Sequence, residues 1–274
     1  MGKTPVVGLA LGAGALKGLA HLGVLKVFAA EKVPIHLITG SSIGSVFGAL
    51  YAAGVDMEFL EKIIEQLPPK GYFDLAVPKM GLIRGNKIES FLRILTKNKH
   101  FADLDIPLYV VAVDLEKREK VIISEGSVAE AVRGSIAIPG IFTPKYWQGR
   151  LLVDGAVLDR VPISIARERG ADVVIAVDVK FGGDQTRVTK VTNIFEIILN
   201  SIDLMEREMV KPRLQRADVL IQPDLSAFSS SDFGKMKECI TKGEQEARKA
   251  LPQIRAVLAA CDNTGPIRND FLGI

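Results

Sequence analysis

The chain has 274 residues, 48% of them hydrophobic and 6% aromatic, which is enough apolar material for a sizeable folded core. The formal net charge is +3, with both signs interspersed along the chain. This composition excludes a largely disordered chain. It also argues against a dedicated nucleic-acid-binding protein, which would concentrate its basic residues in a patch.

The first predicted element is a buried strand over Val6–Leu11, followed by a glycine-rich segment from Gly12 to Gly18 and a helix over Lys17–Glu31. A dinucleotide-binding fingerprint would need its third glycine where Lys17 stands. A P-loop would need Ser or Thr after the lysine, but Gly18 follows it. Both phosphate-binding motifs therefore fail. Backbone N–H groups at such a turn can instead hold an oxyanion, and a plain tight turn is the alternative interpretation.

The next predicted strand, Ile35–Thr39, leads directly into Gly40-Ser41-Ser42-Ile43-Gly44 and a helix over Ser45–Ala53. A Gly-x-Ser-x-Gly between a strand and a helix is typical of a nucleophile elbow, in which a sharp turn exposes the serine hydroxyl. The glycines Gly40 and Gly44 would let the backbone pack closely around that turn. Ser42 is therefore the predicted nucleophile, near unpaired N–H groups at the start of a helix.

A serine nucleophile needs a base, and the three histidines do not fit the order of α/β-hydrolase triads, in which the histidine comes last. They are His21 in a predicted helix, His36 in a predicted strand, and His100. An aspartate or glutamate that acts directly on the serine is the better hypothesis. Three aspartates end predicted strands, where ligand sites of open α/β sheets gather, and all three stay open as the base: Asp114, Asp154 and Asp178.

Helices and strands continue to alternate along the chain. Predicted helices cover Asp56–Leu67, Asn86–Thr96, Asn193–Arg213 and Phe233–Leu258, and predicted strands cover Leu108–Val113, Lys120–Ser124, Leu151–Val153, Val173–Val177 and Val219–Ile221. This alternation predicts the α/β class, as a single domain with a largely parallel sheet flanked by helices on both faces. The domain is expected to span residues 1–261, and residues 262–274 to form a C-terminal tail.

In the predicted helix Asn193–Arg213, apolar residues recur at helical spacing on one face, namely Ile194, Ile198, Ile202, Met205 and Met209. Such a face usually packs in a core or in a dimer seam. The functional alternative is an acyl-chain wall or a membrane-facing flap, with basic residues meeting lipid headgroups: Lys211, Arg213 and Arg216. A homodimer is expected only through this helix.

No run reaches 18 apolar residues, which predicts that there is no transmembrane helix. The N-terminal apolar stretch lacks signal-peptide character because Lys17, His21 and Lys26 interrupt it, and Val6 stands where a myristoylation motif needs Ser or Thr. The cysteines Cys239 and Cys261 form no disulfide framework and indicate a reducing compartment. We expect a cytoplasmic protein, at most peripheral at the inner membrane face.

Three motifs together resemble those of the patatin-like phospholipase family in order and spacing: Gly12 through Gly18, Gly40 through Gly44, and Asp154-Gly155-Ala156. The block from Arg133 to Gly140 resembles the segment before the aspartate motif in bacterial members of that family. The resemblance implies a three-layer sandwich and a Ser–Asp dyad, with Ser42 as the nucleophile and Asp154 as the general base.

The resemblance also implies an oxyanion hole made by the backbone N–H groups of Ala13, Gly14 and Ala15, with Lys17 and Gly18 supporting the loop. Alanine stands at positions 13 and 15, where the family usually has glycine. Alanine keeps its N–H donor, but a positive φ would cost it about 1 kcal/mol.

The activity that the resemblance implies is hydrolysis of fatty-acyl esters of phospholipids or other lipids through an acyl-enzyme, without a metal or another cofactor. The expected partners are a lipid or acyl-ester substrate and, peripherally, a membrane, but no nucleic acid. Acyl transfer or thioester hydrolysis on the same acyl-serine is an alternative that the residues do not separate from hydrolysis. A lipid-binding regulator that has lost turnover is another, and a dinucleotide oxidoreductase is the weakest.

Overall fold

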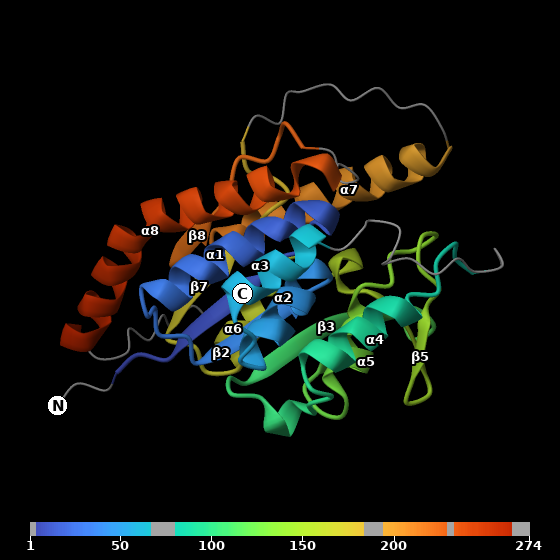
Figure 1. Ribbon diagram of the computed structural model, residues 1–274, viewed down its shortest axis with the longest axis horizontal. Helices are drawn as coiled ribbons and strands as arrows, with labels where there is room; N and C mark the ends of the chain where they lie inside the picture. The colour runs from blue at the N-terminus through green and yellow to red at the C-terminus, as the bar shows by residue number, and fades with distance from the viewer. Residues whose placement is uncertain (1–3, 67–79, 184–193, 229–232, 265–274) are drawn as a thin grey trace, which may run out of the picture.

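The computed structural model describes residues 4–66, 80–183, 194–228 and 233–264, and it shows an eight-stranded sheet with helices on both faces (Figure 1). The strands are β1 (Val7–Leu11), β2 (Leu37–Ser41), β3 (Leu108–Asp114), β4 (Glu119–Ile123), β5 (Lys145–Trp147), β6 (Arg150–Asp154), β7 (Val173–Val177) and β8 (Val219–Ile221). Parallel pairs join them in the order β3-β2-β1-β7-β8, whereas β4 and β6 pair antiparallel with β3, and β5 antiparallel with β6. This mixed, mostly parallel sheet confirms the predicted α/β class.

Strands β2 and β6 meet end to end along one edge of β3. Val111 of β3 pairs with Ser41, the last residue of β2, and the next residue, Ala112, pairs with Asp154, the last residue of β6. The other edge of β3 is occupied by β4, which pairs with all residues from 110 to 114. The carboxyl ends of β2 and β6 therefore face each other, which brings together two positions that are 112 residues apart in the sequence.

Two layers of helices cover this sheet. The helices are α1 (Leu19–Ala30), α2 (Ile43–Ala52), α3 (Met57–Gln66), α4 (Asn86–Leu95), α5 (Val128–Ser135), α6 (Ile163–Glu168), α7 (Ile194–Leu214) and α8 (Met236–Thr264). Short 3₁₀ turns are η1 (Ala15–Gly18), η3 (Phe101–Asp103), η4 (Gly155–Val157) and η5 (Phe233–Lys235). Helices α6 and α7 cover one face of the sheet, and α1, α2, α5 and α8 pack on the other.

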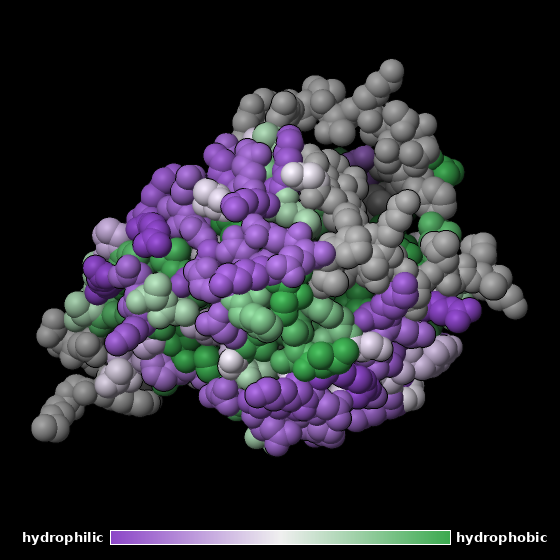
Figure 2. Space-filling model, in the orientation of Figure 1, coloured by the Kyte–Doolittle hydropathy of each residue, from purple (hydrophilic) through white to green (hydrophobic). Residues whose placement is uncertain are grey.

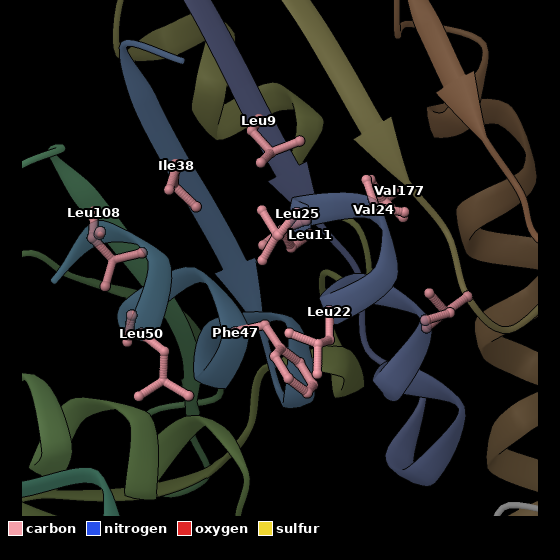
Figure 3. Close-up of a cluster of buried hydrophobic side chains, with 14 of the residues drawn as sticks. Leu9, Leu11, Leu22, Val24, Leu25, Ile38, Phe47, Leu50, Leu108 and Val177 are labelled. Carbon is pink, nitrogen blue, oxygen red and sulfur yellow. The ribbon is translucent and has the colours of Figure 1, made fainter. Parts of the chain in front are cut away.

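Successive residues of each strand point to opposite faces, so they join two different cores. Leu9 and Leu11 of β1 lie in the larger core with side chains of α1 and α2 (Figure 3), whereas Ala10 between them lies in the smaller core under α6 and α7. Because both faces are covered, β1, β2 and β7 are buried at every position. This explains why the parallel strands read as continuous apolar runs in the sequence.

Helix α8 lies along α1, and two glycines let the two backbones come into contact. A Cβ atom on Gly23 would collide with the carbonyl oxygen of Ile240, and one on Gly243 with that of Ala20. Cys239 of α8 donates its thiol hydrogen to the Lys17 carbonyl at 3.3 Å, and burial raises the pKa of this thiol to about 12. Helix α8 therefore fixes the start of α1, while much of its outward surface is hydrophilic (Figure 2).

The predicted elements have counterparts among the described residues, with a few differences. His36 is an exposed residue before β2 rather than part of a strand, because β2 begins at Leu37. Helix α8 continues to Thr264, so residues 262–264 are helical rather than a loose tail, and the rest of the predicted tail lies outside the described residues. The predicted ends at Leu67 and Asn193 also lie outside them. The sequence does not predict α5, β5 or α6, because elements of 8, 3 and 6 residues show little periodicity.

The apolar face predicted on α7 is not part of a core. Ile194, Ile198, Met205 and Met209 are exposed, whereas Val210 and Leu214 on the opposite face pack in the smaller core. The core interpretation of that face is therefore wrong. In the part of the chain that the structure describes, no helix combines the length and the apolar character needed to cross a membrane.

Candidate active site

Ser42 lies in a strained turn between β2 and α2. Its backbone has φ +53° and ψ −127°, a conformation that residues other than glycine rarely adopt and that persists where the surroundings enforce it. The flanking glycines make this turn possible by close approach. A Cβ on Gly40 would lie 2.6 Å from Ser45 Cα, and one on Gly44 would collide with the carbonyl oxygen of Leu11 in β1. The local geometry is therefore that of a nucleophile elbow.

The Ser42 hydroxyl donates a hydrogen bond to a buried carboxylate. Ser42 Oγ lies 2.5 Å from Asp154 Oδ2, and the two residues are 4% and 3% exposed. The other carboxylate oxygen, Asp154 Oδ1, accepts the N–H of Ala156 at 2.8 Å, which fixes the orientation of the side chain. A short hydrogen bond between a nucleophile and a base held by a third group is the arrangement that covalent catalysis requires.

The other two aspartates that end strands have structural partners of their own. Asp114 Oδ1 accepts the N–H groups of Glu116 and Lys117, each at 3.2 Å. Asp178 accepts the N–H of Lys180 at 3.0 Å and the side-chain amide of Gln222 at 2.9 Å. Of the three aspartates that the sequence leaves open, the structure brings Asp154 to Ser42.

Burial and the neighbouring groups shift the pKa of Asp154 in opposite directions. Burial raises the pKa of Asp154 to about 6, and the hydroxyl of Ser42, the N–H of Ala156 and the charges of Arg160 and Lys180 limit this rise by stabilising the carboxylate. A pKa near 6 keeps the group ionised at pH 7 while making it a stronger base than an exposed aspartate.

A second serine, Ser135, forms a hydrogen bond with the backbone of the elbow. The N–H of Ser42 donates to Ser135 Oγ at 2.9 Å, and Ser135 in turn donates to the Val111 carbonyl at 2.6 Å. Ser135 is the last residue of α5, within the block from Arg133 to Gly140. Its role was not foreseen, because the contact joins residues 93 positions apart.

The glycine-rich segment packs beside the elbow. A Cβ on Gly18 would collide with Ile43, the residue after Ser42, and one on Gly14 would collide with Val179. The N–H of Ala13 donates to the Arg160 carbonyl at 3.0 Å, so in this conformation it is not available to an oxyanion. Within the described chain the N–H groups of Gly14 and Ala15 donate no hydrogen bond. These two N–H groups therefore remain the candidate oxyanion donors.

Only one of the two alanines in this segment carries backbone strain. Ala15 has φ +48°, whereas Ala13 is not among the described residues with positive φ. We expect Ala15→Gly to raise the free energy of unfolding by up to about 1 kcal/mol, because glycine adopts this conformation without a Cβ clash. Urea unfolding monitored by circular dichroism measures the change. Ala13→Gly is the matched control and should destabilise slightly; an equal gain from both variants would contradict the strain argument.

His21 forms a hydrogen bond with the glycine-rich segment rather than with Ser42. Its Nε2 lies 2.7 Å from the Gly12 carbonyl oxygen, and burial lowers the pKa of the imidazole to about 4, so the ring is neutral and donates. His36 Nδ1 accepts the N–H of Val7 at 3.0 Å, and His100 is the N-cap residue before η3. That His21 positions the loop is not predictable from local sequence, because the contact depends on the packing of α1 against β1.

A partly buried ionic cluster, which the sequence does not predict, lies near Ser42 and Asp154. Arg160 Nη2 lies 3.0 Å from Glu206 Oε2, and Lys180 Nζ lies 2.6 Å from Asp203 Oδ1. Burial raises the pKa of Glu206 to about 7, while burial and the charge of Lys180 lower the pKa of Lys17. Glu206 and Asp203 belong to α7, so this helix is attached to the active-site edge of the sheet by its charged side chains.

Comparisons with known proteins agree with this geometry. Residues 9–167 match the family model described as patatin-like phospholipase. An uncharacterized NTE family protein of Mycobacterium tuberculosis is 37% identical over 177 residues, which are 64% of this chain and 49% of that protein. A lysophospholipase NTE1 of Coccidioides immitis is 27% identical over 91% of this chain and 18% of its own length. The chain thus spans about half the length of the mycobacterial relative and less of the fungal one.

Two solved structures share the fold. VipD from Legionella pneumophila superimposes with a TM-score of 0.64 at 14% identity, over 93% of this chain and 67% of that one. The type III effector protein ExoU superimposes with a TM-score of 0.51 at 12% identity, over 92% of this chain and 54% of that one. At such low identity these likenesses concern the fold alone.

Proposed function

Because the chain belongs to the patatin-like phospholipase family, we propose that it is a serine acyl hydrolase that cleaves fatty-acyl esters of phospholipids or lysophospholipids. The observation that carries this proposal is the 2.5 Å hydrogen bond from Ser42 Oγ to Asp154 Oδ2 in a nucleophile elbow. In this proposal Ser42 is the nucleophile and Asp154 the general base. Gly14 and Ala15 supply oxyanion donors.

In the first half of the reaction, Asp154 accepts the hydroxyl proton as Ser42 Oγ attacks the ester carbonyl. The carbonyl oxygen becomes an oxyanion, which the N–H groups of the glycine-rich segment stabilise at the start of a helical turn. When the tetrahedral intermediate collapses, the bond to the leaving oxygen breaks and Asp154 returns its proton to that oxygen. The lysolipid or alcohol leaves, and the acyl group stays on Ser42.

In the second half, Asp154 accepts a proton from a water molecule that attacks the acyl-serine carbonyl. A second oxyanion forms in the same place and collapses, and the bond between the acyl group and Ser42 Oγ breaks. Asp154 gives the proton back to the serine, and the fatty acid is released. Acyl transfer would differ only in the acceptor that replaces water, so the products distinguish it from hydrolysis.

The test is labelling with a fluorophosphonate probe, followed by peptide mapping and by assay of fatty-acid release from a phospholipid and a lysophospholipid. Ser42 should be modified, and Ser42→Ala should abolish both labelling and release. Ser41→Ala is the matched control, because the neighbouring Ser41 hydroxyl is buried without a hydrogen-bond partner among the described residues. Labelling of a folded sample at another serine, or none at all, would overturn the proposal.

The pKa of Asp154 predicts how the activity depends on pH. The base works in its ionised form, so kcat/KM for a water-soluble ester should be level above pH 7 and fall about tenfold per pH unit well below 6. The profile should be measured with near-ultraviolet circular dichroism at each pH, which separates titration from unfolding. Glu206→Gln, which removes the neighbouring group with a pKa of about 7, should keep the inflection near pH 6. A profile that stays level down to pH 4.5 would exclude Asp154 as the titrating base.

A further inference from the structure

Helix α7 exposes several large apolar side chains while it turns acidic side chains inward. Glu206 faces inward and is 5% exposed, and Asp203 on the same side pairs with Lys180. Six large apolar side chains are 38–66% exposed instead: Ile194, Ile197, Ile198, Leu204, Met205 and Met209. A surface helix normally turns its charged side chains to water and its apolar ones to the core.

The six exposed side chains, which we call the α7 apolar face, lie on one side of the helix, with the exposed Ser201 and Glu208 among them. At 3.6 residues per turn they fall within an arc of about 140°, and the inward-facing Asp203, Glu206 and Val210 fall on the opposite side. The helix has 21 residues, so its length is about 30 Å. Figure 2 shows hydrophobic atoms at the end of the molecule where α7 begins in Figure 1. An exposed apolar patch of this extent marks an interaction surface.

Basic side chains flank the α7 apolar face. Lys211 and Arg216 are exposed near the carboxyl end of the helix, and Arg207 is partly exposed beside this face. Glu208 is the exposed acidic residue among them. An apolar face with a cationic border is the composition of helices that lie in the interface of a bilayer containing anionic lipids.

The helix that carries the α7 apolar face is attached, through its other side, to the active-site edge of the sheet. Arg213 Nη1 donates to the carbonyl of Leu158, a partly exposed apolar residue that follows the Asp154 turn, at 2.6 Å. The ion pairs of Glu206 with Arg160 and of Asp203 with Lys180 tie the helix to the same edge. A lipid surface in contact with the outward side of α7 would therefore be separated from this edge by the width of the helix, about 10 Å.

We propose that the α7 apolar face docks on the surface of a membrane that contains anionic lipids. The face enters the boundary between headgroups and acyl chains, and Arg207, Lys211 and Arg216 contact lipid phosphates. This docking rests on the proposed lipid hydrolysis and deepens it, because it would hold the protein on the surface that contains the acyl esters. The binding itself requires no catalysis and is measurable in an inactive chain.

The experiment is co-sedimentation of the Ser42→Ala chain with vesicles of phosphatidylcholine and phosphatidylglycerol, compared with vesicles of phosphatidylcholine alone. Binding to the anionic vesicles is expected, and it should weaken as salt rises. The double variant Ile198→Ser/Met205→Ser should lower the affinity at least tenfold. The matched control, Phe59→Ser/Ile94→Ser, removes two side chains that are 56% and 74% exposed on α3 and α4, and it should bind like the parent.

Several outcomes would overturn the membrane proposal. One is that the parent does not sediment with anionic vesicles; another is that both double variants bind as well as it does. A third is that ultracentrifugation shows a dimer for the parent and a monomer for Ile198→Ser/Met205→Ser, while both bind vesicles equally well. A second copy of the chain would then cover the face. Failure of the proposed function is a separate result. In that case the wild-type chain would bind vesicles through α7 but release no fatty acid and leave Ser42 unlabelled.

Discussion

Replacement of Asp154 by asparagine is expected to lower kcat/KM for ester hydrolysis by about 10³- to 10⁴-fold. Asparagine has the shape of aspartate, but it cannot accept the proton of Ser42 at any pH near neutrality. The loss should appear in kcat, because the buried Asp154 side chain is placed to act on Ser42 rather than to hold the substrate. Steady-state hydrolysis of a short-chain ester measures the effect without involving a membrane.

Asp114→Asn and Asp178→Asn are the matched controls, because both aspartates are buried at strand ends but bind backbone, amide or guanidinium groups away from Ser42. Each control variant, provided that it folds, should hydrolyse the ester at close to the wild-type rate. If Asp154→Asn hydrolysed the ester at the wild-type rate, the Ser–Asp dyad would be excluded.

The stability of Asp154→Asn provides an independent check of the buried carboxylate. The folded-state pKa of about 6 lies above the ordinary value of 3.8, so the stability that this group contributes is present below pH 3.8 and is lost as pH rises through 6. Asparagine never ionises. The variant should therefore unfold at an equal or higher temperature than the wild type at pH 8, and the difference should vanish near pH 4.

The second large effect is expected from Gly44→Ala. The new methyl group would collide with the backbone carbonyl oxygen of Leu11 and approach that of Gly12 at 2.8 Å, and a backbone atom cannot rotate away. The elbow would have to move away from β1, at a cost of about 3 kcal/mol in the free energy of unfolding. A displacement of about 1 Å at the nucleophile also lowers activity by about 10²-fold.

Gly48→Ala, one turn further along α2, separates this collision from the general effect of alanine in a helix. Its new methyl group would meet the side chains of Ile38 at 3.0 Å and Leu108 at 3.4 Å, which can shift. The higher helix propensity of alanine offsets part of that crowding, so we expect a change below about 1 kcal/mol and near-normal activity. Urea unfolding and ester hydrolysis should be measured for both variants. Equal losses of stability and activity in Gly44→Ala and Gly48→Ala would contradict the close-approach argument.

The features that were predictable from the sequence are local ones. The elbow around Ser42 could be recognised because its glycines, its serine and the flanking strand and helix are contiguous. The core strands β1 and β7 could be recognised because burial on both faces leaves an uninterrupted apolar run. The choice among Asp114, Asp154 and Asp178 could not be made from local sequence, since it depends on the pairing of β6 with β3.

The contacts that support the site also could not be predicted from the local sequence. His21 and Ser135 have ordinary helix positions, and their roles arise from contacts with Gly12 and Ser42 across packed elements. The N–H of Ala13 could be counted as an oxyanion donor from the motif, yet the structure pairs it with the carbonyl of Arg160. Such contacts depend on the packing of elements that lie far apart in the chain.

The end-to-end meeting of β2 and β6 on β3 has a consequence for the newly made chain. A polypeptide that has folded only as far as β4 already contains the Ser42 elbow, but it has no Asp154 opposite Ala112. Because alternate residues of a strand face opposite sides, a slip of β6 by one residue would turn the carboxylate away from the serine. Under the proposed function, Ser42 therefore lacks its base until β6 pairs in register with β3, which makes ester cleavage a sensitive reporter of that pairing.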